Sequence, residues 1–131
     1  METFAVYIND HEHGPRQILS LLNGQAPAHW VLLACPPRMS RHLGRWLSQP
    51  AKKKWRQRWS EEALHEVIER VRAKGDTYEV RVVREPHPKL ERELRRTYRG
   101  LRTIDARRLQ DRWEVPAGAA AMGTLMTLAV E

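Results

Sequence analysis

The sequence predicts an α/β domain: a three-layer sandwich in which helices cover both faces of a mainly parallel, roughly five-stranded sheet. Two short apolar runs are continuous rather than alternating, which is typical of strands buried on both faces. Segments with strand character also alternate with segments of helical periodicity, as repeated strand–helix units do. The chain has 131 residues, the usual length of one domain, so we expect residues 1–131 to share one core.

A strand followed by a helix is predicted near the N-terminus. Residues 4–8 are apolar, mostly β-forming residues, and the run ends at Asn9 and Asp10, which suit a turn. Pro15 fits the first turn of a helix, and apolar side chains then recur at helical spacing until Gly24. This is the first strand–helix unit.

The second unit begins with the apolar run HWVLLAC at residues 29–35, which Pro36 and Pro37 close. Continuous hydrophobicity over this length predicts a strand buried on both faces. Ser40 is placed to cap a short basic helix that Pro50 ends. The order of strand and helix is thereby repeated.

A long helix is the clearest element of the sequence. Ser60 stands at a capping position, acidic residues follow in the first turn, where the amide dipoles favour negative charge, and Gly75 lies just past the end. Apolar side chains between these two residues share one face. Trp55 and Trp59 continue the four-residue spacing backwards, so the helix could also begin before Ser60.

A third strand–helix unit and a final strand complete the pattern. Residues 77–84 alternate as a strand with one wetter face does, and Pro88 opens a helix that Gly100 closes. Residues 101–108 fit a polar fourth strand and a helix equally well. Residues 124–130, TLMTLAV, are predicted to form a buried last strand.

The positive charge of the protein is concentrated in one segment. The formal net charge is +7, yet residues 36–59 contain eight basic side chains and no acidic one, against 15 basic and 16 acidic side chains elsewhere. We interpret residues 38–59 as a basic insertion, with an anionic partner as one explanation. The basic side chains of the segment are Arg38, Arg41, Arg45, Lys52, Lys53, Lys54, Arg56 and Arg58.

Two interpretations of the basic segment stay open. Its cations could neutralise nucleic-acid phosphates while Trp46, Trp55 or Trp59 stacks on unpaired bases. Alternatively, the tryptophans face the core and the cations cover the solvated side of a helix. The spacing favours an inward position for Trp55 and Trp59, but an ordinary solvated helix mixes charges of both signs, and this segment does not. A membrane-surface role is disfavoured because Pro50 interrupts any long amphipathic helix.

Candidate catalytic and metal-binding groups are few. Cys35 is the single cysteine and fits a core residue better than a nucleophile. The stretch DHEH at residues 10–13 offers imidazole and carboxylate groups, but adjacent loop residues diverge in direction, so we expect a solvated turn. The common catalytic and phosphate-loop motifs are absent, so no catalytic residue and no metal are predicted.

The sequence also predicts where the protein resides. A lone cysteine favours a reducing compartment. The N-terminal residues lack a cationic leader, and apolar segments fall short of the roughly 20 residues that cross a bilayer. We therefore expect a cytoplasmic protein without a membrane partner.

The order of elements resembles that of the universal stress protein family. The likeness rests on three segments: FAVYINDHEHGPRQILSLL, HWVLLACPP and ALHEVIERVRAKGDTYEVRVVREPHPKLERELRRTYRG. The family has a five-stranded parallel α/β fold, and its members pair their final strands in dimers. The resemblance therefore implies a homodimer formed through residues 125–130.

The resemblance and the sheet type together point to one edge of the domain. Ligands of parallel sheets lie beyond the carboxyl ends of the strands, which here means Asn9, Asp10, Cys35 and residues 85–87. The resemblance implies that a nucleotide-binding member would hold ATP or AMP near Asn9 or Asp10. The G-x-x-G-x9-G-(S/T) phosphate motif of such members is not matched, because the region corresponding to it has no glycine until Gly118. The resemblance thus implies a divergent member with a degraded site and no resident cofactor.

Three functions follow as hypotheses. The first is a non-enzymatic cytoplasmic module, stress-associated or regulatory, that resembles universal stress proteins. The second is a nucleic-acid- or polyanion-binding protein that uses residues 38–58. The third is an adenine-nucleotide-binding protein with a rebuilt site near Asp10.

Overall fold

The structure, a computed structural model, describes residues 1–38 and 41–108. Strands and helices alternate along this part of the chain. Their order is β1 (Glu2–Ile8), α1 (His13–Gln17), α2 (Leu19–Leu22), β2 (Ala28–Ala34), α3 (Arg41–Trp46), α4 (Gln49–Lys74), β3 (Thr77–Val82), α5 (Pro88–Thr97) and β4 (Arg102–Asp105).

The described strands form one parallel sheet in the order β3-β2-β1-β4. β1 pairs with β2 and with β4, and β2 pairs with β3, all in parallel register. The predicted α/β class with a parallel sheet is therefore confirmed. Residues 101–108, which fit a strand and a helix equally well by sequence, contain β4. The predicted fifth strand at residues 124–130, and with it the predicted dimer edge, lies outside the described residues.

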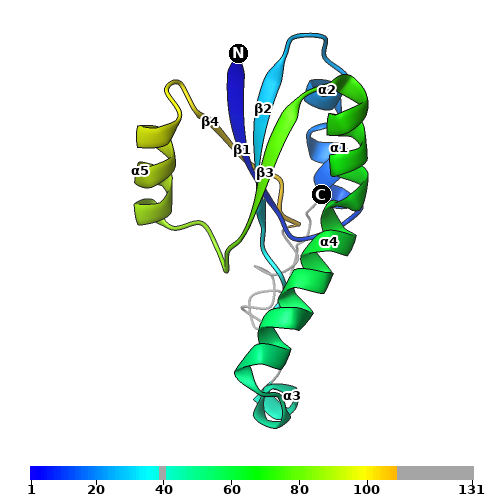
Figure 1. Ribbon diagram of the computed structural model, residues 1–131, viewed down its shortest axis with the longest axis vertical. Coiled ribbons are helices and arrows are strands. Elements are labelled where there is room, and N and C mark those ends of the chain that lie inside the picture. The colour runs from blue at the N-terminus through cyan, green and yellow to red at the C-terminus, as the bar shows by residue number, and fades with distance from the viewer. Residues whose placement is uncertain (39–40, 109–131) are drawn as a thin grey trace, which may run out of the picture.

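Helices cover both faces of the sheet, α1, α2 and α4 on one side and α5 on the other (Figure 1). Successive side chains of a strand point to opposite faces. Val6 and Leu32 accordingly pack in the cluster under α4, whereas Tyr7 and Leu33 pack in the cluster under α5. β1 and β2 therefore need apolar side chains at consecutive positions, which explains their unbroken apolar sequences.

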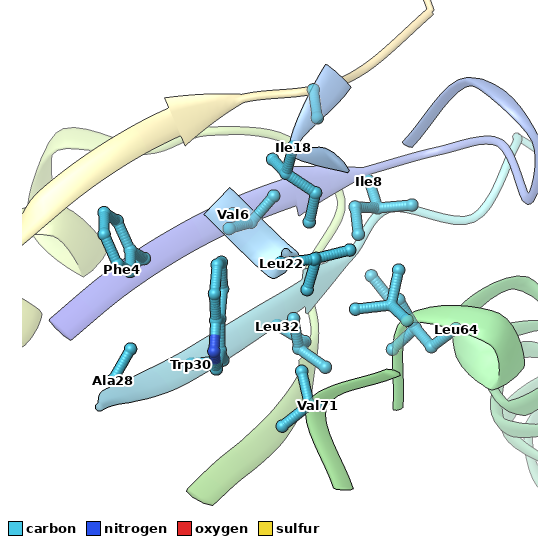
Figure 2. Packing of buried hydrophobic residues seen from close by; sticks show 13 residues of the cluster. Phe4, Val6, Ile8, Ile18, Leu22, Ala28, Trp30, Leu32, Leu64 and Val71 are labelled. Carbon is cyan, nitrogen blue, oxygen red and sulfur yellow. The ribbon is translucent and has the colours of Figure 1, made fainter. Parts of the chain in front are cut away.

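The larger core cluster lies between the sheet and the helices α1, α2 and α4 (Figure 2). Phe4 and Trp30 come from neighbouring strands and stack with their ring centroids 4.8 Å apart. Ile18, between α1 and α2, and Leu22, at the end of α2, pack over the same face of the sheet. Leu64 packs on the cluster from α4, so α2 and α4 both cover the apolar face of β1 and β2.

α4 is a 26-residue helix, and only the part from Trp59 onward packs on the sheet. Its buried residues all lie between Ser60 and Val71. The first turns run past the ends of the strands toward α3 (Figure 1). The acid-free basic segment thus forms α3 and the overhanging part of α4.

The start of α4 corrects one prediction. A helix beginning at a Ser60 cap is wrong, and the earlier start suggested by the tryptophan spacing is right. Ser48 caps the helix and accepts a hydrogen bond from Ala51 N at 3.2 Å, with Pro50 in the first turn. Ser60 is buried inside the helix, where its hydroxyl donates to the Arg56 carbonyl at 2.8 Å.

A buried acid joins the amino ends of β2 and β3 to the end of α4. Asp76 Oδ2 accepts from Trp30 Nε1 at 3.0 Å and lies 2.9 Å from Lys74 Nζ, while Oδ1 accepts from Ala28 N at 3.2 Å. The Asp76 side chain is only 3% exposed. Burial acts to raise its pKa, but the donors from Trp30, Lys74 and Ala28 outweigh burial and hold the pKa below the usual 3.8.

Asp76→Ala should lower the free energy of unfolding at pH 7 by about 3 kcal/mol, because it leaves the Trp30 indole N–H and the Lys74 ammonium without their acceptor. Because the folded-state pKa of Asp76 is lowered, its contribution is present above pH 3.8 and is lost as the pH falls through the folded-state value. Urea denaturation at several pH values measures both effects.

Glu66→Ala is the matched control, because Glu66 forms an exposed ion pair with Arg70 at 3.3 Å and its loss should cost less than about 1 kcal/mol. Equal losses of stability in the two variants at pH 7 would contradict the structural role of Asp76.

Candidate anion-binding cleft

A cleft of about 720 Å³ opens at the carboxyl edge of the sheet. It lies between the chain segments that follow β2 and β3, α3, and the overhanging turns of α4. We call it the basic cleft. Its basic lining residues are Arg38, Arg45, Lys52, Arg56 and Arg84, and its other lining residues are Pro36, Pro37, Gly44, Trp55 and Glu85.

The five basic side chains come from separate parts of the chain. Arg38 follows β2, Arg45 lies in α3, Lys52 and Arg56 lie in α4, and Arg84 follows β3. Within the described part of the chain, none of these side chains forms an ion pair or a hydrogen bond with another residue. A concave surface with several uncompensated cations concentrates positive potential and attracts anions.

The helical geometry of α4 determines which of its residues reach the cleft. Lys52 and Arg56 are four residues apart and therefore lie on one side of the helix. Both are half-buried. Lys53, Lys54 and Arg58 are exposed and do not line the cleft.

The three tryptophans of this region have different environments. Trp59 packs against the main core, as its spacing predicts. Trp55 is half-buried and lines the basic cleft, so one aromatic ring lies among the cations. Trp46, in α3, is 75% exposed. An aromatic wall beside cations suits a ligand that combines phosphate groups with a flat ring.

Part of this lining is predicted by the sequence. Of the predicted basic residues, Arg38, Arg45, Lys52 and Arg56 meet in the cleft, and Arg41 lies in α3. Glu85 belongs to the predicted edge positions. Arg84 was not predicted, because it lies outside the acid-free segment. The available signal was its position directly after a strand, since all strand ends of a parallel sheet meet at one edge.

The polar residues after β1 form a separate cluster with the segment after β4. Arg108 N donates to Asn9 Oδ1 at 2.6 Å, and Arg108 Nη1 lies 3.0 Å from Asp10 Oδ2. Asp10 Oδ1 also accepts from the backbone N–H groups of Glu12 and His13 at 2.9 and 2.8 Å. Burial acts to raise the Asp10 pKa, but these donors outweigh it and lower the pKa. Asn9 and Asp10 are thus engaged by the protein itself and lie outside the lining of the basic cleft.

The turn at residues 10–13 begins α1. His11 and Glu12 are exposed, and the Asp10 carboxylate holds the backbone of the turn. In residues 1–38 and 41–108 there is no group of three or more His, Cys, Asp or Glu side chains positioned to hold a metal ion.

Cys35 is buried in the core cluster under α5. Its Sγ donates to the Leu33 carbonyl at 3.6 Å. Burial raises the pKa of the thiol to about 11, so the group is protonated at neutral pH. The side chain contributes to packing near the carboxyl edge and does not line the basic cleft.

Comparisons of the chain with family models, curated proteins and solved structures found no match. Within the described ranges, no helix combines the length and the apolar character needed to cross a bilayer. The resemblance to universal stress proteins therefore stays a prediction.

Cys35 should react with iodoacetamide far more slowly in the folded protein than in urea at pH 7.5, because burial and a pKa of about 11 suppress the thiolate. Mass spectrometry of timed aliquots measures the modified fraction. Equal rates in the folded and unfolded protein would contradict the buried position.

Proposed function

We propose that the protein binds single-stranded nucleic acid and that the basic cleft holds its phosphates. The observation that carries this proposal is the convergence of five cations, unpaired within the described residues, around the half-buried ring of Trp55. Cations that neutralise phosphates release counterions and supply most of the non-specific affinity for nucleic acids. The positive charge of the cleft therefore makes it the part of the molecule best suited to bind the phosphates of a nucleic-acid strand.

Trp55 favours a single strand over a duplex. The bases of a duplex are stacked on one another, whereas an unpaired base exposes a flat face that an indole can cover. Stacking of this kind contributes about 1–3 kcal/mol per base and tolerates any base. A cleft with one ring and several cations is thus suited to strands of varied sequence.

The proposal does not depend on the predicted location, oligomeric state or family of the protein. A cytoplasmic location, a homodimer through residues 125–130 and membership in the universal stress protein family stay predictions. Binding of ATP or AMP near Asp10 is the competing hypothesis. The carboxylate of Asp10 is already held by Arg108 and two backbone donors, which favours the basic cleft as the ligand site.

The variant Lys52→Gln with Arg56→Gln should weaken binding of a fluorescent single-stranded oligonucleotide. Each phosphate contact contributes about 0.7 to the slope of log affinity against log salt, so losing two contacts should reduce the slope by about 1.4. Fluorescence anisotropy titrations at several salt concentrations measure the affinity and the slope.

Lys53→Gln with Lys54→Gln is the matched control, because it removes the same charge from exposed residues that do not line the cleft. Equal losses in the two double variants would show that net charge, rather than the cleft, determines binding. Stabilisation of the protein by AMP or ATP without any oligonucleotide binding would contradict the proposal and support the nucleotide hypothesis.

A further inference from the structure

A second basic surface lies on the outer side of α5. Leu94 is buried and Leu90 is half-buried, and both pack in the core cluster on the α5 side of the sheet. The basic residues of this helix are all exposed. They are Lys89, Arg92, Arg95 and Arg96.

The two acids of α5, Glu91 and the exposed Glu93, only partly offset its four basic side chains, so this surface keeps an excess of positive charge. Glu91 is half-buried, and its Oε2 accepts from the core residue Tyr7 at 3.5 Å. Within the described part of the chain, Arg92 and Arg96 form no ion pair. Because the two are four residues apart, they lie on one side of the helix. Packing accounts for the leucines but gives the arginines no role.

A shallow hollow connects this surface to the basic cleft. It has a volume of about 420 Å³ and lies beside the segment that joins β3 to α5. Arg84 and Glu85 line both the hollow and the basic cleft, and Lys89 lines the hollow at the first turn of α5. Leu90 adds an apolar contact surface there. Glu93 lines the hollow as well, so Arg84 and Lys89 lead from the cleft to α5 beside the acids Glu85 and Glu93.

We propose that a single strand bound in the basic cleft continues across this hollow onto α5, where Arg92 and Arg96 contact its phosphates. This inference rests on the proposed function and adds the path and length of the bound strand. α5 has ten residues, and its axis of about 15 Å extends the binding surface well beyond the cleft. A long strand can then contact Arg92 and Arg96, whereas a short strand bound in the cleft does not reach them.

The test compares single strands of about 4 and about 16 nucleotides, the range of site sizes found in single-strand binders. Arg92→Gln with Arg96→Gln should lower the salt slope for the long strand by about 1.4, weaken its binding severalfold, and leave the short strand unaffected. Arg16→Gln with Arg70→Gln removes equal charge from exposed residues of α1 and α4, on the opposite side of the sheet, and should change neither strand's binding.

The outcomes separate this inference from the proposed function. An unchanged slope for the long strand in the α5 variant overturns the extended path, as does an equal slope for both lengths in the unmodified protein. An unchanged affinity and salt slope for the short strand after Lys52→Gln with Arg56→Gln overturns the cleft itself. Circular dichroism of each variant confirms that the fold is intact, since none of these changes removes a core contact.

Discussion

Burial of β1 and β2 on both faces is the constraint from which the rest of the structure follows. These strands present apolar side chains on both faces of the sheet, so helices must cover both. Helices joining parallel strands bring the chain back to the same starting edge each time, and every strand then ends at the opposite edge. The segments carrying Arg38, Arg84 and Arg108 are thereby placed along one edge although they are distant in sequence. The amino edge is held by the buried carboxylate of Asp76.

The overhang of α4 turns this edge into a cleft. The half of α4 that covers the sheet supplies Leu64 and Val67 to the core, whereas the half beyond the sheet supplies Lys52 and Arg56 to the basic cleft. Five cations against the single acid Glu85 leave an excess of positive charge in the cleft, and binding of an anion relieves the repulsion among the cations. The same helix therefore stabilises the fold at one end and presents charge at the other.

The sequence predicted the strands and helices better than it predicted which residues come together in the folded protein. Continuous apolar runs identified the strands, because burial on both faces leaves an unambiguous pattern. The start of α4 was misplaced at Ser60, because a serine followed by acidic residues is typical of a helix cap. In the folded protein Ser60 is instead buried inside the helix by tertiary packing. Arg84 was missed because its role depends on which strand lies beside β2. The arginines of α5 were hidden in a near-neutral charge total, since Glu91 and Glu93 in the same helix and acids elsewhere in the chain balance them.

The most direct test of the account is an NMR titration that follows the tryptophan indole N–H signals as a single-stranded oligonucleotide is added at low salt. Trp55 lines the basic cleft, whereas Trp30 is buried at the other edge with its indole N–H bonded to Asp76. If the basic cleft holds the strand, the Trp55 signal shifts, added salt reverses the shift, and the Trp30 signal stays in place. An unchanged Trp55 signal at saturating oligonucleotide would contradict binding in the cleft.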